Sequence, residues 1–241
     1  MATPHERLGL SRGQVDRAGV VLRRWAATGV PAGPEVFAAS TTLAAFRDEF
    51  RVPLRLVVMG LRSAVRTEGA EVIVGERLKR QARIVEKLTR FRRMELSRMQ
   101  DIAGCRATLP NQDAAYRVLE RIRHHKSRVL RVDDYVADPK PSGYRAIHAI
   151  VERNGAPVEI QLRTLRQQQW AMHVEDLDTV HGVQLKSDEG PAAALDYLRV
   201  YAEALAEQDA IGILTAATAR RVAAARAAAM RELRRGGVRW R

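Results

Sequence analysis

The stretch Asp138-Pro-Lys-Pro-Ser-Gly-Tyr-Arg-Ala-Ile-His148, followed by Val158-Glu-Ile-Gln-Leu-Arg-Thr164, carries the most informative pattern in this chain. The segment from Asp138 to Gly143 contains two prolines and a glycine, which cannot continue a helix or a central strand. It is therefore predicted to form a rigid turn. From this turn onward, a Lys, a Tyr, a His, a carboxylate, a Gln and an Arg fall within 26 residues, which is unusual for one hairpin.

A β-hairpin is predicted after the turn. Residues Tyr144 to Val151 are predicted as a strand, and Asn154-Gly155 is a two-residue hairpin signal. The returning strand is predicted from Ala156 to Arg163. A hairpin at this place puts the two polar segments next to each other.

Polar side chains alternate along both predicted strands. Tyr144 and His148 share one face of the first strand, and Glu159, Gln161 and Arg163 share one face of the second. If the strands pair in the expected register, both rows meet in one cleft. The alternative is an ordinary solvated hairpin face, because polar alternation is typical of any half-exposed sheet.

A second polar cluster lies upstream. Basic residues recur there at helical spacing and predict a cationic stripe suited to a triphosphate, with a solvated helix face as the alternative. The stripe consists of Arg80, Arg83, Lys87 and Arg90. Asp101 lies just before the apolar strand predicted from Gly104 to Leu109, and Glu159 supplies a second carboxylate. Magnesium is commonly held by one or two carboxylates plus substrate phosphates, so this pair is a candidate Mg²⁺ site.

Six ordered blocks in residues 72–186 resemble the RelA/SpoT-type synthetase domain, a family whose small stand-alone members make guanosine alarmones. The blocks are Arg77-Leu-Lys79, Ile84-Val-Glu-Lys87-Leu-Thr-Arg90, Asp101-Ile-Ala-Gly-Cys-Arg106, Pro139-Lys-Pro-Ser-Gly-Tyr-Arg-Ala-Ile-His148, Glu159-Ile-Gln-Leu-Arg-Thr164, and Trp170-Ala171 with Glu175. The resemblance implies an α/β fold, with a central mixed β-sheet of about five strands and flanking helices, of the nucleotidyltransferase-like type.

The activity that the resemblance implies is a pyrophosphokinase, which moves the β,γ-diphosphate of ATP onto a ribose 3′-hydroxyl and releases AMP. Catalysis would come from positioning and charge stabilisation, because phosphoryl-type transfer needs little covalent chemistry from the protein. On the donor side, the resemblance places Arg77 and Arg106 around the adenine of ATP, with Lys79, Lys87 and Arg90 on its phosphates. Asp101 and Glu159 would hold Mg²⁺, and Glu159 would also accept the proton of the attacking hydroxyl.

On the acceptor side, the resemblance implies that Tyr144 stacks on the acceptor base. Lys140 and His148 would reach the acceptor phosphates, while Gln161 and Arg163 would support the floor of the site. The chain departs from the family at Arg83, where many members carry Ser, and at Asp176, where many carry His. Neither a Gly-x-x-x-x-Gly-Lys-Ser/Thr loop nor a Gly-x-Gly-x-x-Gly motif is present. No hydrolase-type His-Asp block is evident, so the enzyme is expected to make its product without degrading it.

Three functions stay open from the sequence. The first is an alarmone synthetase that uses GDP or GTP as acceptor. The second is a toxin, held in check by an antitoxin protein, that transfers diphosphate to the 3′-CCA end of tRNA and stops translation. The third is an inactive RNA-binding module, which the retention of Asp101 and Glu159 argues against.

The basic charge of the chain is concentrated in two segments. Its formal charge is +13, but residues 76–131 hold 16 basic against six acidic residues, and residues 218–241 hold eight arginines against one glutamate. Localised positive charge favours polyanionic partners such as nucleotides or RNA. The alternative is a biased genomic base composition, since Arg outnumbers Lys 36 to 5.

The remaining sequence predicts helices around the catalytic part. Helices are expected at 12–28 and 35–66, broken by Pro31-Ala-Gly-Pro34 and Pro53, then at 111–125, 165–180, 192–208 and 213–235. The predicted division is a helical extension (1–70), the synthetase domain (71–187) and an Ala/Arg-rich helical tail (188–241). The tail is a candidate for pairing between subunits or for RNA binding. The single cysteine, Cys105, is expected to be buried, and with no apolar stretch of membrane-spanning length a cytoplasmic protein is expected.

Overall fold

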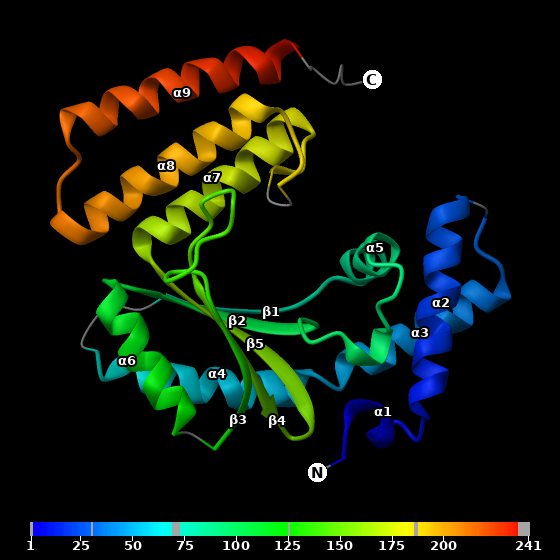
Figure 1. Cartoon of the computed structure of the whole chain (residues 1–241). Helices are drawn as coiled ribbons and strands as arrows, with labels where there is room; N and C mark the ends of the chain where they lie inside the picture. Colours follow the sequence, from blue (N-terminus) through cyan, green and yellow to red (C-terminus); the bar gives the residue numbers. More distant parts are fainter. Residues whose placement is uncertain (1, 30, 69–72, 125, 186–187, 236–241) are drawn as a thin grey trace. The chain divides into compact units, whose positions relative to one another are not determined.

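The computed structural model describes residues 2–29, 31–68, 73–124, 126–185 and 188–235. Its strands form one five-stranded sheet in the order β1-β2-β5-β4-β3 (Figure 1). The strands are β1 (Ile73–Leu78), β2 (Ala103–Leu109), β3 (Arg128–Asp134), β4 (Ile147–Arg153) and β5 (Ala156–Thr164). This confirms the predicted α/β fold with a central five-stranded sheet.

Helices occupy most of the remaining chain. They are α1 (Pro4–Arg7), α2 (Arg12–Thr28), α3 (Pro34–Asp48), α4 (Arg51–Arg66), α5 (Gln81–Arg90), the 3₁₀ helix η1 (Leu96–Arg98), α6 (Gln112–Arg123), α7 (Leu165–His181), α8 (Ala192–Ile211) and α9 (Ala216–Arg235). Within the described residues, no helix combines the length and apolar character needed to cross a membrane.

The predicted hairpin is confirmed at its turn. Asn154 and Gly155 both have positive φ, 49° and 71°, as a type I′ turn requires. The predicted start of its first strand was wrong, because β4 begins at Ile147 and not at Tyr144. The Tyr144 carbonyl instead accepts a hydrogen bond from the Lys140 amide, so the backbone there closes the preceding turn.

One predicted helix boundary was also wrong. Pro53 was expected to break the helix at 35–66, but the break lies at Glu49 and Phe50, and Pro53 sits in the first turn of α4. Proline is tolerated there because the first N–H groups of a helix have no intrahelical partner. At α6, the predicted cap is confirmed, since the Asn111 side chain accepts from the Ala114 amide at 2.9 Å.

The chain divides into two compact units. The first comprises Met1–Ala107, Val118–Val132 and Ala149–Gln161, and the second comprises Thr108–Arg117, Asp133–His148 and Leu162–Arg241. The predicted domain boundaries at residues 70 and 187 lie outside the described residues.

The core of the first unit consists of buried apolar side chains from α2 to α5 and from the strands. Phe46 and Phe50 meet edge to face, with ring centroids 5.4 Å apart. Ile84 and Leu88 of α5 are fully buried, so the opposite side of that helix is left to its charged residues.

The core of the second unit lies among α7, α8 and α9. Trp170 is buried there, and its indole N–H donates to the Leu198 carbonyl at 2.9 Å. The loop before β4 packs on α8 through Gly143, whose φ is +88° and where a Cβ would lie 2.6 Å from the Cβ of Ala202. Only glycine fits this position, because a side chain would meet both backbone strain and a steric clash.

Candidate active site

In the first unit, two lysines converge on Asp101. Lys79 directly follows β1. Its backbone amide donates to the carbonyl of Ile102, the residue before β2, at 2.8 Å, and this bond sets Lys79 beside the start of β2. Its ammonium lies 2.7 Å from Oδ2 of Asp101, and the ammonium of Lys87 on α5 lies 2.7 Å from the same oxygen. Three residues that the family resemblance assigns to ATP and its metal ion are therefore in direct contact.

The electrostatics of this cluster favour an ionised Asp101. Burial raises the pKa of its carboxyl, but the hydrogen bonds and charges of Lys79 and Lys87 outweigh burial and lower the pKa below its ordinary value. The second oxygen, Oδ1, is buried and has no hydrogen-bond partner among the described residues. A buried carboxylate oxygen without a hydrogen-bond donor is suited to bind a further cation.

Glu159 and Gln161 lie on β5, and the Gln161 amide donates to Oε2 of Glu159 at 2.8 Å. The neighbouring strand β2 carries Gly104 opposite them, where a Cβ would lie 3.9 Å from Oε2 of Glu159. The Glu159 carboxylate therefore lies over the face of β2 that Gly104 presents. Arg106, two residues further along β2, is on that same face, because strand side chains alternate.

Arg77 and Arg106 are exposed on adjacent strands. The Arg106 side chain lies over Gly75 of β1. A Cβ added at Gly75 would be 3.3 Å from Nε of Arg106. Arg77 is two residues beyond Gly75 and so shares that face. One face of the sheet in this unit thus presents two guanidinium groups together with Glu159.

The other predicted cations are placed differently. Arg80 is the residue before α5 and is exposed, as are Arg83 and Arg90. Arg83 pairs with Glu86 at 2.7 Å, and the Arg90 guanidinium lies 5.4 Å from the centroid of the Phe91 ring. Of the predicted stripe, Lys87 is the residue that the structure brings to Asp101.

The carboxylate oxygens of Asp101 and Glu159 are ligands of the type that a hard divalent cation prefers. Asp101 offers a buried oxygen without a partner, and Glu159 offers a second carboxylate in the same unit. No cluster of three or more metal-ligating side chains occurs in the described residues. This composition suits Mg²⁺, which is bound by one or two carboxylates with the rest of its shell supplied by substrate phosphates and water.

The second unit holds a hydrogen-bonded chain around Tyr144. The buried Arg163 donates to the Tyr144 hydroxyl at 2.7 Å and to the Gln168 side-chain oxygen at 3.0 Å. The same hydroxyl lies 2.6 Å from Nε2 of His148. Since Arg163 can only donate, the hydroxyl accepts from it and its own hydrogen is available for His148.

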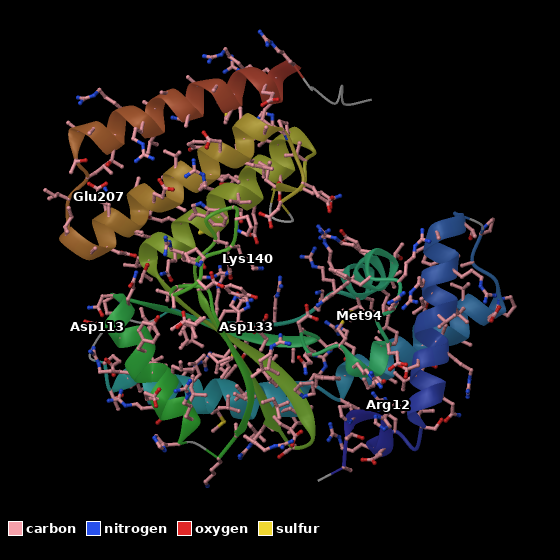
Figure 2. The ribbon with its side chains drawn as sticks, in the orientation of Figure 1. Arg12, Met94, Asp113, Asp133, Lys140 and Glu207 are labelled. Atoms are coloured by element: carbon pink, nitrogen blue, oxygen red, sulfur yellow. The ribbon has the colours of Figure 1, made fainter. Side chains whose placement is uncertain are left out.

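Aromatic rings surround the same residues. Tyr135 packs edge to face on both Tyr144 and His148, with centroids 5.9 and 5.3 Å apart. The Lys140 ammonium lies 4.7 Å from the centroid of Tyr135 and 5.2 Å from that of Tyr144, so it is held by cation–π contacts (Figure 2 labels Lys140). The cation–π contacts with Tyr135 and Tyr144 thus bring Lys140 to the same rings as His148.

The structure adds two residues that sequence reasoning missed, Tyr135 and Gln168. Tyr135 ends the segment Val132-Asp-Asp-Tyr135 just before the proline-rich turn, and that position was the available signal. The predicted common face of Tyr144 and His148 agrees with their hydrogen bond. That Glu159 and Gln161 share a cleft with Tyr144 and His148 stays a prediction.

Comparisons with known proteins bear on the family. Residues 76–177 match the model described as the region found in RelA / SpoT proteins. Over 101 residues the chain is 35% identical to a guanosine-3′,5′-bis(diphosphate) 3′-pyrophosphohydrolase of Vibrio cholerae, covering 41% of this chain and 12% of that protein. It is 34% identical over 82 residues to the GTP pyrophosphokinase YwaC of Bacillus subtilis, covering 30% of this chain and 39% of YwaC. The chain thus spans less than half the length of these curated relatives.

Solved structures match over more of the chain. Small alarmone synthetase 1 from Bacillus subtilis is 30% identical in one structure, with a TM-score of 0.53, covering 68% of this chain and 92% of that one. Its structure bound to the product pppGpp is 29% identical, with a TM-score of 0.56 and the same coverage. Together with the matched family region, this similarity shows that the chain belongs to the RelA/SpoT family of synthetase domains.

Proposed function

We propose that this chain is a pyrophosphokinase that transfers the β,γ-diphosphate of ATP to the ribose 3′-hydroxyl of GDP or GTP. The observation that carries the proposal is the contact of two ammonium groups with one oxygen of Asp101. Family membership and similarity to small alarmone synthetases support the same assignment.

The donor residues have complementary tasks in this proposal. Phosphate oxygens of ATP attract Lys79 and Lys87, because ammonium groups form strong charge-assisted hydrogen bonds with phosphate. Arg77 and Arg106 stack on the adenine, as planar guanidinium groups do on aromatic rings. Arg90 adds charge for the phosphates. Movement of the lysines toward ATP would leave the Asp101 carboxylate available to a metal ion.

Glu159 acts as the general base. The acceptor 3′-oxygen attacks the β-phosphorus of ATP, the bond from that phosphorus to the α,β-bridging oxygen breaks, and AMP leaves. The hydroxyl proton passes to the Glu159 carboxylate, while the Gln161 amide holds Oε2 of Glu159 in place. One oxygen of Glu159 is thereby oriented by a hydrogen bond before substrate binds.

Asp101 and Glu159 are the residues that would hold Mg²⁺. When bound, the ion neutralises charge that develops on the transferred diphosphate. The residues of this chain keep their own roles beside it, with Lys79 and Lys87 stabilising negative charge from the protein side.

The acceptor residues follow from the second unit. Tyr144 offers its ring to the acceptor base, and Lys140 and His148 are assigned to the acceptor phosphates. Arg163 supports Tyr144 through the hydrogen bond to its hydroxyl.

A second candidate acceptor is the 3′ end of tRNA, which would make the protein a toxin restrained by an antitoxin partner. The concentrated basic charge of residues 76–131 and 218–241 favours this alternative, since an RNA acceptor needs phosphate contacts outside the active site. The steps that involve ATP are the same whether the acceptor is a guanine nucleotide or tRNA.

The test is transfer of label from γ-labelled ATP with Mg²⁺, offering GDP, GTP and bulk tRNA separately. We expect label in the guanine nucleotide, loss of transfer by several orders of magnitude in Glu159→Gln, and normal transfer in Glu120→Gln, an exposed glutamate on α6. Label in tRNA alone would move the assignment to the second candidate. Transfer to none of the three, by folded protein, would contradict the pyrophosphokinase proposal.

A further inference from the structure

Helix α9 carries an excess of arginine that the proposed reaction does not use. It holds six arginines and one acidic residue, Glu232, and all six arginines are exposed. Glu232 is engaged elsewhere, since its carboxylate accepts from the amide of Ala193 in the first turn of α8 at 2.9 Å. The only acid on α9 therefore serves to cap its neighbour and does not offset the arginine charge.

Four of the six arginines lie on the side of α9 opposite its apolar residues. Ala229 and Leu233 are buried, and Val222 and Met230 are partly buried, in the core that α9 shares with α8, beside which it runs antiparallel (Figure 1). At 100° per residue, positions 220, 231, 234 and 235 fall on the opposite side of the helix. Nitrogen-tipped side chains project from α9 on the side away from α8 (Figure 2).

Most of this charge is not compensated. Arg221 pairs with Glu203 of α8 at 3.0 Å. For the remaining arginines of α9, no carboxylate of the described residues lies within ion-pair distance. These arginines are Arg220, Arg226, Arg231, Arg234 and Arg235. Four of these, Arg220, Arg231, Arg234 and Arg235, lie on the outer face of α9, which thus presents uncompensated guanidinium groups.

Two kinds of partner do not suit this face. An amphipathic helix binds a membrane through its apolar side, and the apolar side of α9 is packed on α8. Isologous pairing with a second copy would bring the same arginines of both chains together, and like charges repel. The complementary partner is a polyanion whose charges are spread over a length comparable to a helix.

We propose that the outer face of α9 is a docking surface for folded RNA. The basic side chains of α9 are all arginines, whose planar guanidinium groups bind phosphate in a bidentate way and stack on unpaired bases, which folded RNA exposes in loops. The face contains no Asn or Gln, the amides that read adenine in a DNA groove. None of these arginines is assigned to the transfer reaction; with tRNA as the acceptor, the same surface would supply the phosphate contacts outside the active site.

The test compares two variants of equal charge. Arg220, Arg231 and Arg234 are changed together to Gln, and the control changes Arg55, Arg62 and Arg66, exposed arginines of α4, to Gln. Binding is measured by fluorescence anisotropy with a labelled RNA hairpin that has an unpaired loop and with a DNA hairpin of matched sequence, at several salt concentrations. Circular dichroism verifies that helix content is kept, which is expected because Gln and Arg have similar helix propensity.

We expect the α9 variant to lose about tenfold or more in RNA affinity and to reduce the slope of log K against log salt by about two to three, since each phosphate contact contributes about 0.9. The α4 variant should change the affinity by less than about threefold, because it removes only general charge. Transfer to GDP should persist in both variants. Equal losses in both variants, DNA affinity equal to RNA affinity, or a change in oligomeric state of the α9 variant would each overturn the assignment.

Discussion

The Lys87 ammonium lies 2.7 Å from Oδ2 of Asp101, which ties helix α5 to the segment just before strand β2. Lys79 reaches the same oxygen, so two cations from different elements share one anion. Both lysines are partly buried, with side-chain exposures of 15% for Lys79 and 26% for Lys87. The cluster therefore holds its charges in place before any substrate arrives.

Replacing either lysine by Met should weaken ATP binding. A hydrogen bond to a charged group is worth about 1.5–3 kcal/mol, so the KM for ATP is expected to rise by about one to two orders of magnitude. Steady-state kinetics with varied ATP at saturating acceptor measures this. Lys126→Met, which removes an exposed lysine, is the control. If only the KM for the acceptor rises, the lysines bind the acceptor and not ATP, and the proposal is contradicted.

Acid should remove the stability that ionised Asp101 contributes. Its folded-state pKa is lowered, so this contribution is fully present above the unfolded-state pKa of about 3.9 and is lost as pH falls through the lower folded-state pKa. Urea unfolding of the wild type and of Asp101→Asn from about pH 7 downward should show a free-energy difference that shrinks in acid. When Lys79 and Lys87 are both Met, burial alone acts on the carboxyl and raises its pKa, so ionised Asp101 should be less stabilising than Asn at neutral pH. A wild-type-like advantage of Asp101 over Asn at neutral pH in that background would argue against the lysines as its cause.

The ring and the hydroxyl of Tyr144 should have separable effects. Tyr144→Ala removes the ring on which the acceptor base is proposed to stack. Such stacking is worth about 1–3 kcal/mol per base, so the KM for the acceptor should rise by about tenfold or more. Tyr144→Phe keeps the ring and loses the hydrogen bonds with Arg163 and His148, which should lower the free energy of unfolding by about 1–2 kcal/mol. Acceptor kinetics and urea unfolding measure the two effects. Equal acceptor KM values in both variants would rule out stacking.

Two glycines should respond differently to alanine. Gly143→Ala places a Cβ 2.6 Å from that of Ala202 at φ +88° and should cost about 2–4 kcal/mol of stability. Gly104→Ala places a Cβ at ordinary contact distances of 3.6–3.9 Å from Glu159. The free energy of unfolding of this variant should therefore stay within about 1 kcal/mol of the wild-type value. Thermal and urea unfolding of both proteins test this. Similar losses would mean that the loop at Gly143 adapts.

Cys105 should be unreactive in the folded protein. Its side chain is buried, and burial, with Glu76 and Glu159 adding to it, raises the pKa of the thiol to about 12. At about pH 8 only about one thiol in ten thousand is then a thiolate, so alkylation should be slow until urea unfolds the chain. Mass spectrometry after timed iodoacetamide treatment follows the reaction. Rapid labelling of native protein would contradict the burial of this strand residue.

Local sequence predicted those parts of the structure that depend on neighbouring residues. The turn at Asn154-Gly155 follows from the tolerance of Asn and Gly for positive φ, and the start of α6 follows from the capping side chain of Asn111. The strand expected from Tyr144 failed because a hydrogen bond from the Lys140 amide holds Tyr144 in the turn. That bond depends on how the loop folds back, which alternation of polar residues does not reveal.

By itself, the sequence determined the residue types available for the chemistry, the order of most elements and the family motif blocks, because these depend on local propensity and spacing. Tertiary structure alone decided that Lys79 and Lys87 share Asp101, and that Tyr135 packs on Tyr144 and His148. The physical reason is that ion pairs and ring contacts require atoms within a few ångströms. Residues distant in the chain reach that distance only when strands pair and helices pack.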